Sequence, residues 1–124
     1  MTGVTLDTGV LIALERRGQR AIALFQRALE RDLVITVPAD VVGEWWRGRT
    51  DLRVTLLQSV DVEPLTESLA KLAGEALAVV RGATLVDAIV MASAAQRGDV
   101  VFSSDLDDLQ KLQRHFPSVR VVRI

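Results

Sequence analysis

Four acidic residues are the side chains of this sequence best placed to do chemistry: Asp7, Glu44, Asp87 and Asp105. Three of them come at or soon after short β-branched runs that are typical of strands, and Asp87 opens an apolar helical stretch. A set of carboxylates without His or Cys suits hard cations such as Mg²⁺ or Mn²⁺. Such a site activates water and stabilises the charge that grows on a phosphate oxygen, so the four acids predict metal-assisted phosphodiester hydrolysis.

Each acid also has a structural interpretation, which the sequence leaves open. Asp7 suits the cap of the helix that follows it, and Glu44 is spaced to pair with Arg47 for about 0.2–0.5 kcal/mol. Asp105, Asp107 and Asp108 lie at the start of the last helix, where negative charge suits the helix dipole. This structural interpretation is preferred for Asp107 and Asp108.

Asp87 is the acid least easily explained by structure alone. The helix expected over Leu85–Gln96 is apolar on nearly all sides, which indicates that it is buried. A buried carboxylate needs a partner, because burial of an isolated charge is very costly. Thr84, the nearest polar residue, is expected to form a capping pair with Asp87. A metal ion shared with other acids would supply the missing partner.

Short β-branched runs alternate with helical stretches along the whole chain. Strands are expected at Val4–Leu6, Leu33–Val37, Val60–Leu65, Val100–Phe102 and Val119–Ile124. Helices are expected over Val10–Arg17, Gln19–Arg31, a stretch from Ala39 or Asp40 through Trp46, Glu67–Arg81, Leu85–Gln96 and, after a cap at Ser104, through His115. This alternation predicts a three-layer α/β/α fold around a mostly parallel five-stranded sheet. Ligands of such sheets bind outside the carboxyl ends of the strands, where Asp7 and Asp105 fall.

Length and composition predict one ordinary globular domain spanning 1–124, since 49% of the 124 residues are hydrophobic and 25% are charged. The absence of cysteine excludes disulfides and thiolate metal sites and fits a reducing compartment. The first residues do not have the pattern of a signal peptide, and no apolar run reaches the ~18 residues of a membrane span. We therefore expect a cytoplasmic protein with no membrane partner.

The net charge of −1 does not by itself favour a nucleic-acid partner. Thirteen of the fifteen cationic residues are nevertheless arginine, the side chain best suited to bidentate phosphate contacts. A bias in coding would give the same richness in arginine. Charge therefore leaves the class of partner open.

Four segments together resemble the PIN-domain family, and within it the VapC-type toxins of type II toxin–antitoxin systems. They are Val4–Ile12, Ile35–Glu44, Thr84–Ala92 and Val101–Leu109. Their order and spacing agree with the family over the whole chain. No single segment is specific to the family. Four segments in this order, each in its expected strand or helix, are specific to it.

The resemblance implies that the family's metal-binding and catalytic acids fall on Asp7, Glu44, Asp87 and Asp105. The family's supporting hydroxyls fall on Thr8 and Ser103, and Asp108 matches an acid that would organise its loop. Gly9 is a departure, because the family frequently has Ser there, and a supporting hydrogen bond would then be missing. The implied activity is a Mg²⁺- or Mn²⁺-dependent endoribonuclease that cuts tRNA or other structured RNA loops. The implied partners are a VapB-type antitoxin and a second copy in a homodimer.

Two further groups are candidates for contact with RNA or with an acidic antitoxin segment. Trp45 and Trp46 point about 100° apart on a helix, so both are not expected to be buried in one small core. An exposed Trp would suit an interface or a stacked base, whereas the alternative places one Trp in the core and the other half-covered. The cationic candidates are Arg16, Arg17, Arg47 and Arg49.

Two competing functions remain at this point. A phosphoacceptor receiver domain also has five strands and an acidic Mg²⁺ site, but it would need paired acids after the first strand and a lysine after the fourth. This chain has one acid after the first strand and Ser103-Ser104-Asp105 after the fourth. A PIN-like module that only binds RNA or protein is the other alternative.

Overall fold

Residues 3–124 are described by a computed structural model, and they form a five-stranded parallel sheet between two layers of helices. The strands are β1 (Gly3–Leu6), β2 (Val34–Pro38), β3 (Asp61–Glu63), β4 (Val100–Ser103) and β5 (Arg120–Arg123). Their order is β3-β2-β1-β4-β5, and each neighbouring pair is parallel. The predicted α/β fold with a parallel five-stranded sheet is therefore confirmed.

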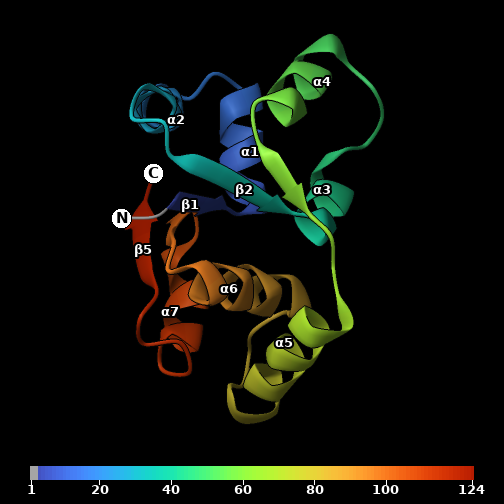
Figure 1. Ribbon diagram of the computed structural model, residues 1–124, viewed down its shortest axis with the longest axis vertical. Coiled ribbons are helices and arrows are strands. Elements are labelled where there is room, and N and C mark those ends of the chain that lie inside the picture. Colours follow the sequence, from blue (N-terminus) through green and yellow to red (C-terminus); the bar gives the residue numbers. More distant parts are fainter. Residues whose placement is uncertain (1–2) are drawn as a thin grey trace.

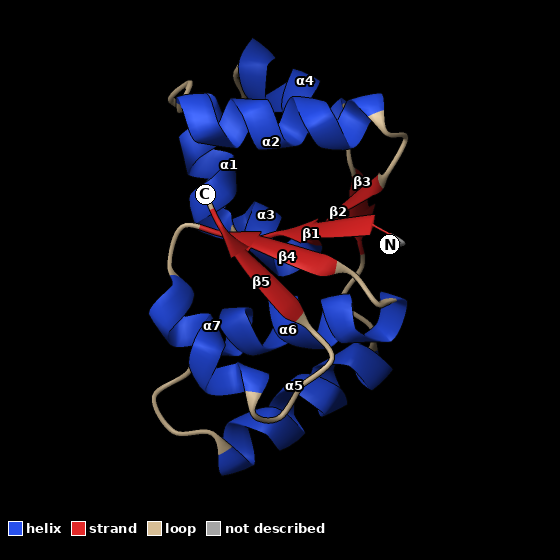
Figure 2. Cartoon of the chain, turned by 90° about the vertical axis from the view of Figure 1, so that its left-hand side faces the viewer, coloured by secondary structure: helices blue, strands red, loops and turns tan. Residues whose placement is uncertain are grey.

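The helices cover both faces of the sheet. Their bounds are α1 (Thr8–Glu15), α2 (Gln19–Glu30), α3 (Ala39–Trp45), α4 (Asp51–Gln58), α5 (Glu67–Val79), α6 (Leu85–Arg97) and α7 (Leu106–Gln113). Helices α1, α2 and α4 lie on one side of the sheet, and α5, α6 and α7 lie on the other (Figures 1 and 2). Helix α3 contacts α1 from one layer and α6 from the other. Within residues 3–124, no helix is both long and apolar enough to cross a membrane.

Several element boundaries differ from the sequence-based expectation for local reasons. Helix α1 begins at Thr8, because the Asp7 carboxylate accepts the Val10 N–H and caps the helix before its first apolar residue. Strand β3 stops at Glu63, because the following proline has no N–H to donate to the sheet. The cap of α7 is Asp105 rather than Ser104, and this helix ends at Gln113.

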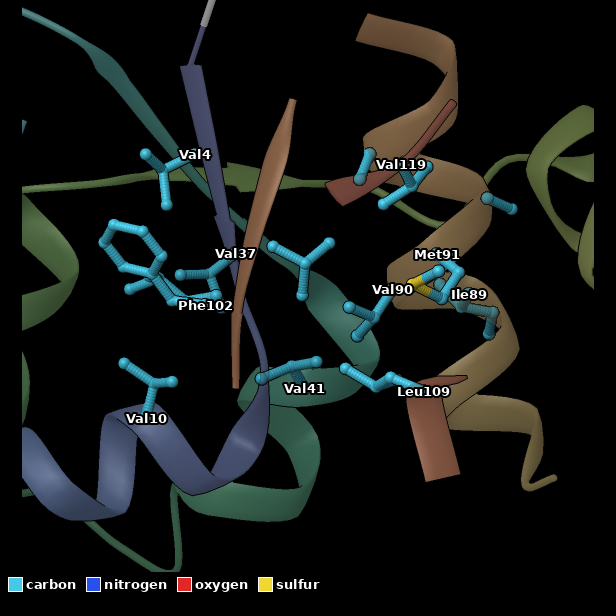
Figure 3. Packing of buried hydrophobic residues seen from close by; sticks show 14 of the residues in the cluster. Val4, Val10, Val37, Val41, Ile89, Val90, Met91, Phe102, Leu109 and Val119 are labelled. Carbon is cyan, nitrogen blue, oxygen red and sulfur yellow. The ribbon is translucent and has the colours of Figure 1, made fainter. Parts of the chain in front are cut away.

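The core lies on both faces of the sheet, because the two central strands are covered from both sides. Every residue of β1 is buried. Val4, Val10 and Phe102 lie on one side of the strands, and Val90 and Leu109 lie on the other (Figure 3). Residues 88–94 of α6 are all buried, as the apolar circumference of this helix predicts. This helix is thus held against the sheet along most of its length.

A polar network fixes the carboxyl-terminal end of α6. The Arg97 guanidinium donates to Asp99 Oδ2 at 3.0 Å, to Thr5 Oγ1 at 2.8 Å and to the Glu63 carboxylate. Ser93 Oγ donates to Glu63 Oε1 at 2.6 Å. These residues tie α6 to β1, β3 and the start of β4. Since α6 leads into β4, its other end must lie at the carboxyl edge of the sheet, and that end carries Asp87.

Candidate active site

Asp7 is the buried centre of the candidate site. It follows β1 directly, is 8% exposed, and caps α1 by accepting the Val10 N–H at 3.0 Å. Burial raises the pKa of Asp7 to about 6, against the opposing hydrogen bonds from Ser103 and Val10. The negative charges of Asp87 and Asp105 raise it further. The structure thus bears out the cap proposed for Asp7 and also places two other acids beside it.

Glu44 belongs to α3 and is linked to the residue after Asp7. Its exposed carboxylate accepts a hydrogen bond from Thr8 Oγ1 at 2.6 Å through Oε1. Thr8 is therefore the hydroxyl that orients Glu44, whereas the resemblance assigns it to the support of the first acid. No ion pair between Glu44 and Arg47 is found among the described residues.

Asp87 lies in the first turn of α6. Its N–H donates to Thr84 Oγ1 at 3.1 Å, and Thr84 in turn hydrogen-bonds the Asp87 carboxylate. This is the capping pair that the sequence predicts. Burial raises the pKa of Asp87 despite the Thr84 hydrogen bond, and the charges of Asp108, Glu44 and Asp105 add to the rise. The Asp87 carboxylate, on the apolar helix α6, therefore lies near other acids.

Asp105 and Ser103 complete the cluster at the end of β4. Ser103 is fully buried, and its Oγ accepts the Asp105 N–H at 2.9 Å, which sets the turn between β4 and α7. The Asp105 side chain is exposed and makes no capping hydrogen bond to α7. Its carboxylate is thus not used by the helix that it precedes. Ser103 Oγ also donates to the Asp105 carbonyl oxygen at 3.0 Å, so both contacts hold this turn.

The donor set fits a hard divalent cation. All four acids offer carboxylate oxygens, the ligands that Mg²⁺ and Mn²⁺ prefer. As the side chains stand in residues 3–124, no three acidic or histidine groups form a ready-made metal site.

Ser104 is a residue of the site that the sequence did not single out. A Cβ placed on Gly9 would lie 1.8 Å from Ser104 Oγ and 3.6 Å from Asp7 Oδ1. The Ser104 hydroxyl thus fills the space that a side chain at Gly9 would take. Two features of the sequence could have indicated this contact. Residue 9 is a glycine without a hydroxyl, and a second serine, Ser104, stands directly before Asp105.

Asp40 is a second acid that the sequence did not single out. It lies one turn before Glu44 in α3, and both carboxylate oxygens are buried without a hydrogen-bond partner in the described part of the chain. Burial raises the pKa of Asp40, and the charges of Glu44 and Glu63 contribute. Asp40 therefore adds negative charge near Glu44.

The tryptophan and arginine candidates for contact with RNA or antitoxin differ in how exposed they are. Trp45 is only 3% exposed, and its Nε1 donates to Glu15 Oε1 at 3.0 Å. Trp46 is half-buried against the core, with its ring edge-on to that of Trp45. The structure thus agrees with the alternative in which one Trp lies in the core and the other is half-covered. The prediction that Trp45 stacks on a base or lies in an interface is wrong, because its ring is buried. Arg16 and Arg47 line a cleft of about 510 Å³ together with Glu44.

Arg17 and Arg49 do not line that cleft, although both are exposed. Arg17 and Arg47 have left-handed backbones, with φ of 59° and 47°, where their loops leave α1 and α3. The cleft beside Glu44 thus gathers two of the four candidate arginines.

The sequence matches a model of the PIN domain over residues 4–114. This chain belongs to the PIN-domain family. The match spans all four candidate acids. A comparison with functionally curated proteins gives no match. The strand order β3-β2-β1-β4-β5 also differs from the 2-1-3-4-5 order of receiver domains, so that alternative is excluded.

Solved structures with the same fold include several toxin–antitoxin complexes. One is VapBC2 from Rickettsia felis, bound to a DNA fragment from its promoter. It is 10% identical to this chain in sequence, with a TM-score of 0.75 and 98% of both chains covered. DNA-bound VapBC from Salmonella typhimurium is 15% identical, with a TM-score of 0.75 and coverage of 99% and 98%. FitAcB from Neisseria gonorrhoeae is 18% identical, with a TM-score of 0.67 and coverage of 95% of each chain. These likenesses bear out the PIN-like α/β/α fold.

Proposed function

We propose that this PIN domain is a Mg²⁺- or Mn²⁺-dependent endoribonuclease and acts as the VapC-type toxin of a toxin–antitoxin pair. The observation that carries the proposal is that four acids from separate segments interact with one another, and that one of them, Asp7, is buried. Each charge acts on another across the fold: Asp87 and Asp105 on Asp7, and Glu44 on Asp87. Mutual repulsion makes such a cluster costly, so a positive ligand is its simplest explanation.

The four acids are proposed as the metal ligands and thereby as the catalytic residues. A bound Mg²⁺ would supply an activated water and positive charge opposite the phosphate oxygens. Asp7 is the most rigid member, because its backbone and one carboxylate oxygen are fixed by the cap of α1. Thr8 orients Glu44, and Ser103 fixes the turn that carries Asp105.

Asp108 would act less directly. It is the first of the neighbouring charges that raise the pKa of Asp87, and its Oδ1 lies 3.5 Å from Lys111 Nζ. We therefore assign it to the organisation of the loop and helix start beside Asp105, rather than to the ligand set. Lys111 partly offsets its charge.

A VapB-type antitoxin and a second copy of the chain are the proposed protein partners. The solved VapBC and FitAcB structures are similar in fold to this chain. On α4, the Leu52 side chain is 40% exposed. Val79 and Leu85 are also exposed, at 68% and 52%. Apolar side chains left open on two sides of the sheet are consistent with two protein contacts.

The test uses purified chain, free of antitoxin, and a pool of total cellular RNA that includes tRNA. Reactions contain Mg²⁺ or Mn²⁺ or an excess of chelator, and cleavage sites are read by sequencing RNA ends. Asp87→Asn is the inactive variant, because it removes charge without a change of volume. Asp61→Asn is the matched control, since Asp61 is an exposed acid on β3 that makes no part of the cluster.

Cutting at few sites that requires metal, survives Asp61→Asn and is lost in Asp87→Asn would support the proposal. Equal cutting by Asp87→Asn, or cutting that is indifferent to chelator, would refute it. A folded chain that binds Mg²⁺ in calorimetry but cuts no RNA in the pool would instead favour the module that only binds.

A further inference from the structure

A cleft of about 640 Å³ lies between the end of α5 and the outer side of α7. Both helices are on the same face of the sheet (Figure 2). The cleft is lined by Arg81 from the loop after α5, and by Lys111, Arg114 and His115 from α7 and the residues that follow it. Its volume is in the range of about 300–1,000 Å³ typical of pockets that take a small ligand.

The charge of this cleft is opposite to that of the chain. Three cationic side chains line it, and Asp107 is the only carboxylate among its lining residues in the described chain. The whole chain carries a net charge of −1. Arg81 and Arg114 are exposed, and within residues 3–124 neither guanidinium forms an ion pair, so both are open to a ligand. A concentration of unsatisfied cations in a concave surface favours an anion.

One residue that lines the cleft is linked to the acid cluster through Asp108. Lys111 Nζ, in the cleft, lies 3.5 Å from Asp108 Oδ1, and Asp108 is the leading neighbouring charge on Asp87. Val79, Val80 and Arg81 form the other wall, and the chain then reaches Thr84, the cap of the helix that carries Asp87. A Cβ placed on Gly82 in this loop would lie 3.4 Å from Lys111 Nζ, so the two walls approach closely.

The geometry of α7 sets the direction of the cleft. The helix rises ~1.5 Å per residue, so Arg114 lies roughly 10 Å further from the acid cluster than Asp107. The cationic groups are therefore spread along a path that leads away from the candidate metal ligands. His115 adds an aromatic ring at the far end, beside Phe116, with ring centroids 4.8 Å apart.

We propose that this cleft binds the sugar–phosphate backbone of single-stranded RNA next to the scissile phosphate. Arg81 and Arg114 contact phosphates, Lys111 balances Asp108 at the entrance, and His115 offers a surface on which a base stacks. Single-stranded RNA is favoured over an acidic protein segment because the cations begin beside the candidate nuclease centre and carry an aromatic platform. The proposal rests on the proposed function, whose acids define where the cleft leads.

The experiment measures binding separately from cleavage. The background is the Asp87→Asn chain, and the probe is a fluorescein-labelled single-stranded oligouridine in Mg²⁺ buffer at several salt concentrations. The cleft variant is Arg81→Gln with Arg114→Gln. The matched control is Arg31→Gln with Arg120→Gln, two exposed arginines that line a different pocket. Lys111 is left in place, since its loss would alter the charge beside Asp87.

The expected result is a Kd for the cleft variant about tenfold weaker at low salt, with the control within about twofold of the parent. The slope of log K against log salt should fall by ~1.4, because each phosphate contact to a single strand contributes ~0.7. In the otherwise native chain, the same cleft variant should raise KM for RNA more than it lowers kcat.

Equal Kd and equal salt slope for cleft variant and control would overturn the inference, even if Asp87-dependent cleavage is found. Absence of any binding to the oligouridine would overturn it as well. A change in mass on light scattering without a change in Kd would show a contact between subunits instead of an RNA site. Cleavage of RNA by the native chain decides the proposed function independently of all three.

Discussion

The sharpest test of the candidate site is a gain in stability when its buried acid is neutralised. Asp7 has a pKa of about 6 in the folded chain, against 3.8 in an unperturbed one, and burial is the main cause. One pKa unit corresponds to ~1.36 kcal/mol, so ionised Asp7 costs the metal-free fold about 3 kcal/mol at pH 7.5. Asp7→Asn removes that charge at constant volume. Asn also caps helices well, and its Oδ1 still accepts the Val10 N–H.

The sign of the effect with pH follows from the direction of the shift. Between about pH 4 and pH 6 the folded chain holds a proton on Asp7 that the unfolded chain has lost. The free energy of unfolding therefore falls as pH rises through this window, by about 3 kcal/mol in total. The advantage of Asp7→Asn should be full above pH 7 and should disappear near pH 4.

The assay is urea denaturation of parent and Asp7→Asn chains in chelator at pH 7.5 and at pH 4.5, with Asp61→Asn as the control for loss of an exposed acid. At pH 7.5 the variant should be more stable by up to about 3 kcal/mol, or roughly 10 °C in Tm. Mg²⁺ should stabilise the parent and leave Asp7→Asn unchanged. A variant no more stable than the parent at pH 7.5, or an advantage that is equal at both pH values, would refute the reasoning.

Three other substitutions test the surroundings of the site. Gly9→Ala should destabilise by about 1–2 kcal/mol because Ser104 occupies the space of the new Cβ, and Ser104→Ala should relieve most of this in a double-mutant cycle by urea denaturation; additive effects would contradict the contact. Thr8→Val should weaken Mg²⁺ affinity about 10–100-fold in calorimetry, since the hydroxyl orients Glu44, with Tm nearly constant; unaltered affinity would remove Thr8 from the site. Arg97→Leu should cost about 1–3 kcal/mol of unfolding free energy by breaking the partly buried charge network. A loss below about 1 kcal/mol would argue that the network does not hold α6.

Local patterns determined most of the elements. The β-branched runs predict all five strands, and their alternation with helices predicts a parallel sheet, because the connection between parallel strands is long enough to need a helix. The capping pair of Thr84 and Asp87 also follows from spacing alone, since its partners are within one turn of each other. The sequence did not predict whether the segment of α4 is a helix or a loop. No residue of α4 is fully buried, so its sequence lacks a clear apolar face.

The boundaries were less predictable, because competing caps lie side by side. Asp7 and Ser104 both precede helices and both can accept an N–H. The structure uses Asp7 as a cap and passes over Ser104 in favour of Asp105, whose turn is set by buried Ser103. Which hydroxyl or carboxylate is used depends on where the preceding strand ends in the sheet, and the sequence near the cap does not contain that information.

The sequence by itself determined which acids are candidates, through their types and their places relative to strands. Only the tertiary structure decided that Asp87, from a helix on one face of the sheet, lies near Glu44 in α3 and near Asp105 after β4. It also decided that Ser104 fills the space at Gly9, and that Arg81 and Arg114 form one cleft. The physical reason is common to all three: these contacts join segments far apart in the chain, and their distances are set by how helices pack on the sheet.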